Sequence, residues 1–432
     1  MGSEEGPLPR RRRVELPEGI LMEVFNRLPV KDIARCTVLS KDIYNLIHSH
    51  AFYRMWISAN LQETVILFSE RDNFSESDDD AGWNSIHSID LMGLDQPDHL
   101  PPHLVEIPHP LAVEDRVDKM FLRGSVKGVL LLEIEKEGVG SRFQIWNPYL
   151  RLLGPIIPLP PGVAAAGGGD EVHYTAVGFG HSHGDFHLLL RLPQEEEEGA
   201  EFLRLTVRIF TLPVGGIQNQ WTSVTSPFLL PVGSHLSGIT TNPFHDHTVL
   251  WTSNHRNRWS VSGFNFENHT FIPAISFPLW DSSDGPRSAP TIRILGDRIC
   301  TYRAATNATA DAHPVVLYQL GDDGRSWTKA ARFHLIFEGE EEDEPELNDM
   351  FRDFVAATWK NPCLVVYTSE DHIMGYDPEN KEFFYFGLQP MQDDDDDDDP
   401  DHPSFAELQA AAYHPSFLWP YPRYGGDQEM VD

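Results

Sequence analysis

The sequence predicts an α+β multidomain protein, in which a small N-terminal three-helix module precedes a much larger all-β domain. Between residues 15 and 52 the apolar residues recur at the spacing of helical turns. Beyond about residue 62, short runs of β-branched and aromatic residues alternate with Gly, Asn, Asp and Pro, which is the pattern of strands and tight turns. A length of 432 residues suits one large domain with a small module attached.

The helical module divides into three predicted helices. The first begins at Pro17, because proline suits a first helical turn, where its missing N–H would have no partner. It ends at Leu28-Pro29, because a residue before proline is disfavoured in the α region. Its apolar stripe consists of Ile20, Leu21, Val24, Phe25 and Leu28. A second helix from about Lys31-Asp32 carries Ile33, Cys36 and Leu39, and a third carries Ile43, Leu46 and Ile47.

This module has more large aliphatic residues than it can bury. Fewer than about 40 residues cannot enclose so many side chains and remain stable alone. Covering about eight of them fully would contribute roughly 12–24 kcal/mol before association costs are subtracted. The excess predicts a partner surface; the alternative is a helical cap that packs on the larger domain.

The same residues resemble the F-box, the motif by which substrate receptors dock on the Skp-family adaptor of Skp–cullin–F-box ubiquitin ligases. The matching positions are Leu16-Pro17, Ile20-Leu21, Val24-Phe25, Arg27-Leu28-Pro29-Val30, Ile33, Arg35-Cys36, Leu39-Ser40-Lys41, Leu46-Ile47 and Phe52. The resemblance implies an adaptor-binding set of Leu16, Pro17, Ile20, Leu21, Val24, Phe25, Leu28, Pro29, Val30, Ile33, Cys36, Leu39, Ile43, Leu46 and Ile47. Ile43 stands where the family usually has tryptophan, and its smaller apolar area allows somewhat weaker docking.

The β-rich part is built from units that recur about every 40 to 50 residues, each ending on an aromatic-rich strand. This is the spacing of four-stranded propeller blades, and about six blades fit the length. Closing such a ring protects strand edges from pairing with other chains. The sequence therefore predicts an all-β propeller over residues 62–390.

Short motifs in this region are similar to the F-box-associated, kelch-like domains of plant-type F-box proteins. Residues 128–131 stand where these domains have a Gly-Leu-Leu strand, and they lead to Trp146-Asn147-Pro148. Gly178-Phe179-Gly180 leads through a hydrophobic strand to Trp221. The segments 264–267, Ser326-Trp327-Thr328 and Tyr376-Asp377-Pro378 also fit. The resemblance spans roughly residues 100 to 390; it implies the architecture and leaves the ligand open.

Charge excludes several function classes. The chain has 33 basic and 66 acidic residues, a net charge of −33, so it repels nucleic acid and anionic membranes. The acidic residues collect at 76–80, 195–198, 338–346 and 393–399, which are expected to be solvated surface insertions. None has the alternating ligands and turn glycine of a calcium loop, while recruitment of a basic substrate stays open. The four arginines at 10–13 indicate a flexible arm or a nuclear localisation signal.

Other features point to a cytoplasmic or nuclear location. No run approaches the roughly 18 apolar residues of a membrane-spanning helix, and no apolar segment follows the N-terminal arginines. Cys36, Cys300 and Cys363 lie far apart and are expected to be reduced, buried thiols. The glycosylation sequons at Asn73, Asn268 and Asn307 are then expected to be unmodified.

The search for catalytic or metal-binding residues finds one candidate cluster. His181, His183 and His187 with Asp185 have the residue types of a metal site and could converge across a hairpin. Ser182, Gly184 and Asp185 are turn formers, however, so the prediction is a turn without metal or cofactor. The Gly167-Gly168-Gly169 run lacks the lysine of a P-loop, and no hydrolase or metalloprotease motif is present.

The predicted organisation has five parts. They are a flexible basic arm at 1–13, the F-box at 14–60, the propeller at 62–390, an acidic disordered linker at 391–402 and a C-terminal tail at 403–432. In the tail, residues 403–413 suit a short helix capped by Ser404, with Glu407 three residues on, or alternatively an extended arm.

The resemblances imply a substrate-recognition subunit of a Skp–cullin–F-box ubiquitin ligase. The F-box would bind the Skp-family adaptor, and through it cullin, while the propeller would bind an unknown protein target. Catalysis would belong to the ligase, not to this chain. The alternative is a small-molecule-binding or catalytic propeller in which the helical segment is a structural cap.

Overall fold

The computed structural model divides the chain into two compact units, residues 1–61 and 62–432. It describes residues 16–59, 64–71, 85–90, 104–111, 119–136, 140–160, 175–191, 202–212, 220–228, 230–231, 247–255, 258–277, 291–295, 298–304, 313–321, 326–335, 353–358, 364–368, 373–377, 382–386, 405–413, 416 and 418–419. The four acidic blocks, the N-terminal arginines, Cys363, Asn73 and Asn307 lie outside these residues.

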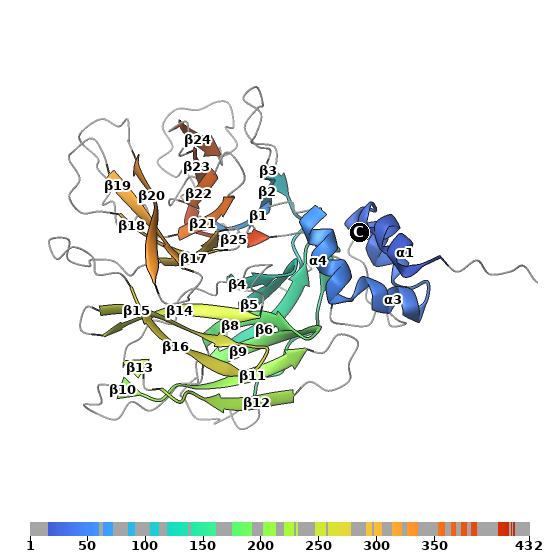
Figure 1. Ribbon diagram of the computed structural model, residues 1–432, viewed down its shortest axis with the longest axis horizontal. Helices are drawn as coiled ribbons and strands as arrows, with labels where there is room; N and C mark the ends of the chain where they lie inside the picture. Colours follow the sequence, from blue (N-terminus) through green and yellow to red (C-terminus); the bar gives the residue numbers. More distant parts are fainter. Residues whose placement is uncertain are drawn as a thin grey trace, which may run out of the picture. The chain divides into compact units, whose positions relative to one another are not determined.

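The first unit is helical, with one helix more than the sequence predicts. Its described helices are α1 (Glu18–Asn26), α2 (Val30–Cys36), α3 (Lys41–Ile47) and α4 (His50–Ala59) (Figure 1). Pro17 and Pro29 stand immediately before α1 and α2, as expected of residues that favour helix starts. No helix in the described part of the chain is long and apolar enough to cross a membrane.

The second unit is a series of antiparallel sheets. Two of them have four strands each. One contains β4 (Lys119–Val126), β5 (Val129–Lys136), β6 (Gly140–Asn147) and β7 (Leu152–Leu153). The other contains β8 (Thr175–Ser182), β9 (Asp185–Arg191), β11 (Thr206–Leu212) and β12 (Gln220–Thr225). A three-stranded sheet follows, with β14 (Thr248–His255), β15 (Arg258–Asn265) and β16 (Thr270–Ser276). A two-stranded ribbon joins β10 (Phe202–Leu203) to β13 (Leu230–Pro231).

Two further four-stranded sheets complete the consecutive series. They contain β17 (Thr291–Leu295), β18 (Arg298–Ala304), β19 (His313–Leu320) and β20 (Trp327–Leu335), then β21 (Asp353–Thr358), β22 (Leu364–Thr368), β23 (Ile373–Asp377) and β24 (Glu382–Phe386). The remaining sheet joins both ends of the unit, with the order β25 (Phe405–Tyr413), β1 (Thr64–Arg71), β2 (Ser85–Asp90) and β3 (Leu104–Glu106) (Figure 1).

One strand of each sheet contacts its counterparts in the neighbouring sheets. These contacts run from β25 to β4, β8, β14, β17 and β21, and return to β25. A closed circuit of antiparallel sheets around their innermost strands is a β-propeller, so the predicted fold class is confirmed. The number of blades in the full domain stays a prediction, since long stretches between the sheets lie outside the described residues.

The predicted helix in the C-terminal tail is wrong. Residues Phe405–Tyr413 form β25, which pairs antiparallel with β1 from Thr64↔Tyr413 to Arg71↔Phe405. Alanine, glutamate, leucine and glutamine favour helix locally, but the unpaired backbone groups of an edge strand are a stronger template. The tail therefore supplies a strand to the propeller, which is closer to the extended alternative.

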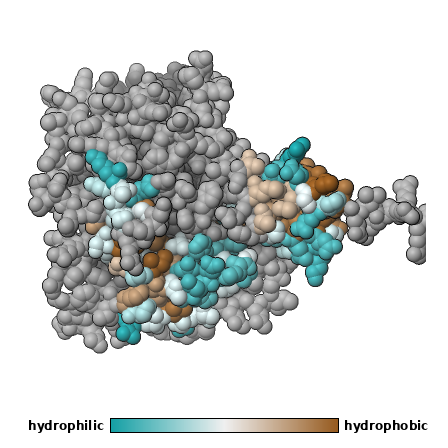
Figure 2. All heavy atoms as spheres, in the orientation of Figure 1, coloured by the Kyte–Doolittle hydropathy of each residue, from teal (hydrophilic) through white to brown (hydrophobic). Residues whose placement is uncertain are grey.

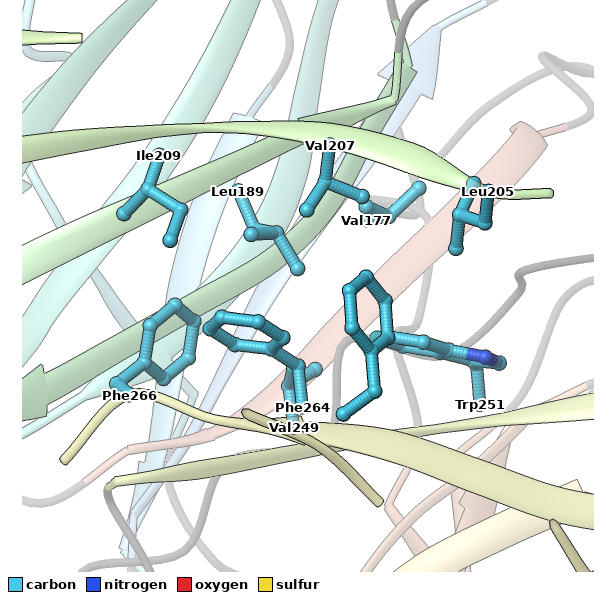
Figure 3. Packing of buried hydrophobic residues seen from close by; sticks show 10 residues of the cluster. Val177, Leu189, Leu205, Val207, Ile209, Val249, Trp251, Phe264 and Phe266 are labelled. Carbon is cyan, nitrogen blue, oxygen red and sulfur yellow. The ribbon is translucent and has the colours of Figure 1, made fainter. Parts of the chain in front are cut away.

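A mixed aliphatic and aromatic core joins two neighbouring sheets (Figure 3). The β8–β9–β11 side supplies mainly aliphatic side chains and the β14–β15–β16 side mainly aromatic ones; the cluster is Val177, Leu189, Leu205, Val207, Ile209, Val249, Trp251, Phe264, Phe266 and Phe271. A Cβ on Gly178 would lie 2.9 Å from Val249 Cγ1, and one on Gly263 would lie 2.3 Å from the Val249 carbonyl oxygen. Glycine at these two positions therefore permits the close approach.

Candidate functional site

Local capping fixes the turns of the helical unit. The Ser40 hydroxyl accepts a hydrogen bond from the Ile43 N–H at 3.1 Å, which caps α3, and the Ser49 hydroxyl accepts one from the Phe52 N–H at 3.2 Å, at the start of α4. Such caps satisfy donors that a helix leaves without partners. They hold the short helices at defined boundaries, so that the apolar side chains face fixed directions.

The helical unit has a core of its own. Ile33, Ile47 and Phe52 are fully buried, and Phe25 meets Phe52 edge to face with ring centroids 6.3 Å apart. The other buried apolar residues are Val30, Ala34, Leu46, Tyr53 and Trp56. The residues Phe52, Tyr53 and Trp56 of α4 thus contribute to a core that three helices alone would leave smaller.

A second group of apolar side chains in this unit faces solvent. We call Leu16, Ile20, Val24, Val38 and Leu39 the exposed apolar set; their exposed fractions are 49, 49, 47, 51 and 66%. Outside this unit, the only other large hydrophobic residues that are exposed among the described residues are Ile156 and Phe228. Ile20 and Val24 lie four residues apart on α1, so they share one helix face, and Leu16 lies just before that helix. Figure 2 shows hydrophobic side chains at the surface of the helical unit.

The predicted adaptor-binding residues divide into three groups by burial. Leu16, Pro17, Ile20, Val24, Pro29 and Leu39 are exposed; Leu21, Leu28, Cys36 and Ile43 are half-buried; Phe25, Val30, Ile33, Leu46 and Ile47 are buried. The buried side chains form the core of the unit and do not present a surface in this conformation. Sequence reasoning missed Val38, because it lies between two helical stripes and its only signal is its position beside Leu39.

Cys36 acts as an apolar residue of the helical unit. Burial, reinforced by the nearby negative charge of Asp32, raises the pKa of its thiol. The thiol is therefore neutral near pH 7 and suits packing better than nucleophilic chemistry. Cys36 and Cys300 are both free thiols; Cys300 is buried as predicted, whereas Cys36 is only half-buried.

The histidine cluster of the propeller lies at a hairpin turn. His183 and Gly184 have φ values of 51° and 93°, and they connect β8 to β9 as a two-residue turn. His183 is exposed, whereas His181 is buried with its ring edge to face on Phe186 at 4.9 Å. Within the described ranges, no group of three or more His, Cys, Asp or Glu residues is arranged to hold a metal ion.

His187 is the centre of a buried hydrogen-bond network that the sequence does not reveal. Its Nε2 lies 2.8 Å from the Ser182 hydroxyl and its Nδ1 lies 3.2 Å from the Thr211 hydroxyl. The Ser182 hydroxyl donates to the Phe266 carbonyl at 3.2 Å, and the His187 ring stacks on the Phe266 ring at 5.5 Å. A Ser–His pair is a chemical unit for nucleophilic catalysis, but Ser182 and His187 are only 6 and 4% exposed. This network therefore ties two neighbouring sheets together instead of facing a substrate.

A known domain family matches the helical unit. Residues 14–55 match the F-box domain family, so the chain carries an F-box domain. It is homologous to the F-box protein CPR1 of Arabidopsis thaliana, with 26% identity over 224 residues. That alignment covers 49% of this chain and 45% of the relative, so the match spans less than half the length of either protein.

Solved structures that resemble the chain have low sequence identity. TolB from Acinetobacter baumannii is 8% identical to this chain and has a TM-score of 0.42. The match covers 81% of this chain and 66% of TolB. The Dos1 propeller is 11% identical to this chain and has a TM-score of 0.32. The match covers 70% of this chain and 65% of the Dos1 propeller.

Proposed function

We propose that this chain is the substrate-recognition subunit of a Skp–cullin–F-box ubiquitin ligase. Its F-box would dock the Skp-family adaptor, and through it cullin, while its propeller would bind a protein target in the cytoplasm or nucleus. The observation that supports this most strongly is the exposed apolar set, because each of its five large apolar side chains is 47–66% exposed. Several exposed large apolar side chains on one small unit are typical of an interaction site.

The mechanism would be one of tethering. A bound target would stand beside the charged ubiquitin-conjugating enzyme, so a bimolecular encounter becomes nearly intramolecular. This chain would then supply binding and position without catalysing a bond change.

Because many of the F-box aliphatic side chains are already buried within the unit, the binding energy that they can contribute is lower than the sequence suggests. Five side chains, each about half exposed, would contribute roughly 4–8 kcal/mol when covered, at about half of 1.5–3 kcal/mol each. Association costs of about 4–15 kcal/mol would consume that gain. We therefore expect half-buried Leu21, Leu28 and Ile43 to contribute as well. Ile43 is the position at which the smaller side chain would weaken docking.

The proposal is tested by placing a charge in the exposed apolar set. Ile20→Asp and Leu39→Asp should each weaken capture of the recombinant Skp-family adaptor by about tenfold or more, because each would bury an unpaired carboxylate at the contact. Ile156→Asp is the matched control, since Ile156 is 48% exposed but lies in the other unit. Adaptor capture at the wild-type level by both F-box variants would contradict the proposal.

Ile33→Asp answers a different question. Because Ile33 is fully buried, that change should unfold the F-box and lose adaptor binding for structural reasons. Circular dichroism of the isolated chain separates the two cases, since Ile20→Asp and Leu39→Asp should keep the helical signal. Affinity purification from native tissue with the proteasome inhibited would then identify the target.

A further inference from the structure

Arg123 lies on β4, the strand of its sheet that contacts the neighbouring sheets. Two contacts hold its side chain in place. Its Nε–H donates to Glu133 Oε2, and its guanidinium carbon lies 4.6 Å from the centre of the Phe121 ring. The Arg123 side chain is 37% exposed, whereas the Glu133 side chain is only 5% exposed. One edge and one face of the guanidinium are thus occupied, and its terminal amino groups have no side-chain partner among the described residues.

The backbone at Arg123 departs from regular strand pairing. In the β4–β5 pairing, Leu122 faces Leu132 and Gly124 faces Leu131, so Arg123 is an unpaired bulge residue. A bulge bends the strand and redirects its extra side chain, and bulges occur often beside binding sites.

The same device recurs in other sheets with apolar residues. The register shifts in β8, β21 and β25 likewise leave one apolar residue each unpaired, namely Val177, Val355 and Ala406. A guanidinium at this place is therefore not needed to form the bulge. A buried ion pair is also rarely the most stabilising choice, since apolar residues of similar size often do as well.

We propose that Arg123 is a target-recognition residue that binds a carboxylate of a protein segment docked on the propeller, and that Glu133 is its positioning residue. This inference rests on the proposed function, because it assigns a target contact to the receptor. A guanidinium offers paired donors that match a carboxylate in a bidentate geometry. The negative charge of the whole chain is screened over about 8 Å at physiological ionic strength, so the local contact decides.

The test uses the full chain in complex with its adaptor and a displayed library of random peptides. The central residue of each peptide is fixed as Asp, Asn or phosphoserine. Wild-type protein should recover Asp peptides about tenfold or more above Asn peptides, the range of a charge-assisted hydrogen bond. Arg123→Gln combined with Glu133→Gln should abolish this preference without leaving a buried carboxylate unpaired.

Controls separate recognition from folding. Arg142→Gln alters another half-exposed arginine of the same sheet and should keep the Asp preference. Glu133→Gln alone should lower the Asp-to-Asn ratio while the thermal unfolding profile stays that of the wild type. No Asp preference in the wild type, an unchanged preference in the double variant, or a preference for phosphoserine over Asp would each overturn the carboxylate assignment. If the wild-type protein does not capture the adaptor at all, that result would instead count against the ligase proposal alone.

Discussion

His187 shows how a single buried side chain can make stability depend on pH. Burial, followed by the nearby His269 and His181, lowers the pKa of His187 to about 4. An exposed histidine titrates near about 6.5, so the unfolded chain binds the proton more readily than the folded one. The stabilisation is complete above about pH 6.5 and is lost progressively as the pH falls towards about 4.

Protonation of His187 should therefore destabilise the propeller at acid pH. Between pH 7 and pH 4, His187 should remove roughly 3 kcal/mol from the free energy of unfolding of the propeller. His187→Phe should flatten this dependence, because phenylalanine has no proton to gain and can still stack on Phe266. Urea unfolding at a series of pH values measures it.

His183→Asn is the matched control for His187. His183 is exposed at φ 51°, a conformation that asparagine tolerates, and its charge has the smallest of the named effects on the pKa of His187, so most of the pH dependence should remain. An unaltered slope in His187→Phe would show that other groups cause the acid sensitivity.

At the scale of elements, the C-terminal strand joins the two ends of the propeller. Strand β25 pairs with β1, and the buried amide of Asn147 donates to the Ser416 and Leu418 carbonyls at 3.0 and 3.2 Å. The Asn147 Oδ1 accepts from the Leu150 N–H at 3.0 Å. The asparagine of the Trp-Asn-Pro motif thus binds both its own turn and the segment that follows β25.

Removing this segment should open the ring. Truncation after residue 390 deletes β25 and should abolish cooperative unfolding of the propeller, because β1 loses a strand partner. Asn147→Asp should destabilise it by about 1–3 kcal/mol or more, since carboxylate oxygens would face the two carbonyls. Near-ultraviolet circular dichroism during heating measures both effects.

The control for that truncation is a chain that ends at Pro420. It keeps every C-terminal residue that the structure describes, so its unfolding profile should equal that of the full chain. If truncation after residue 390 leaves the profile unchanged, β25 is not needed for closure.

These elements also show what the sequence can predict. Periodicity located α1, α2 and α3 but not α4, and Gly184 marked the β8–β9 turn, because these signals are local. The partner of β25 lies near the other end of the chain, so no local pattern indicated the pairing. The apolar stripe likewise predicted an interaction surface, but it could not separate exposed Val24 from buried Phe25, since that depends on how the helices pack.

At the scale of the whole molecule, charge is divided unequally between the two units. Residues 1–61 contain nine basic and seven acidic side chains, which leaves 24 basic and 59 acidic ones for the rest. The propeller unit therefore has a net charge of −35 and the F-box unit one of +2, so all the net negative charge belongs to the propeller unit. The F-box is close to neutral, so its association with the adaptor should depend on apolar contact more than on long-range attraction.

The division into two units predicts two separate unfolding transitions. The F-box unit is small and leaves five large apolar side chains exposed, so it should unfold at a lower temperature than the propeller. A partner that binds only the folded F-box at 100 times its Kd would stabilise that unit by about 2.7 kcal/mol. Calorimetry with the adaptor should therefore raise the first transition by several degrees and leave the second unchanged. A tenfold loss of affinity in Leu39→Asp would leave about 1.4 kcal/mol of this stabilisation, so the shift should fall to about half or less while the propeller transition stays unaltered. A single transition that moves as a whole would mean that the two units unfold together, and the F-box could not then be treated as an independent docking module.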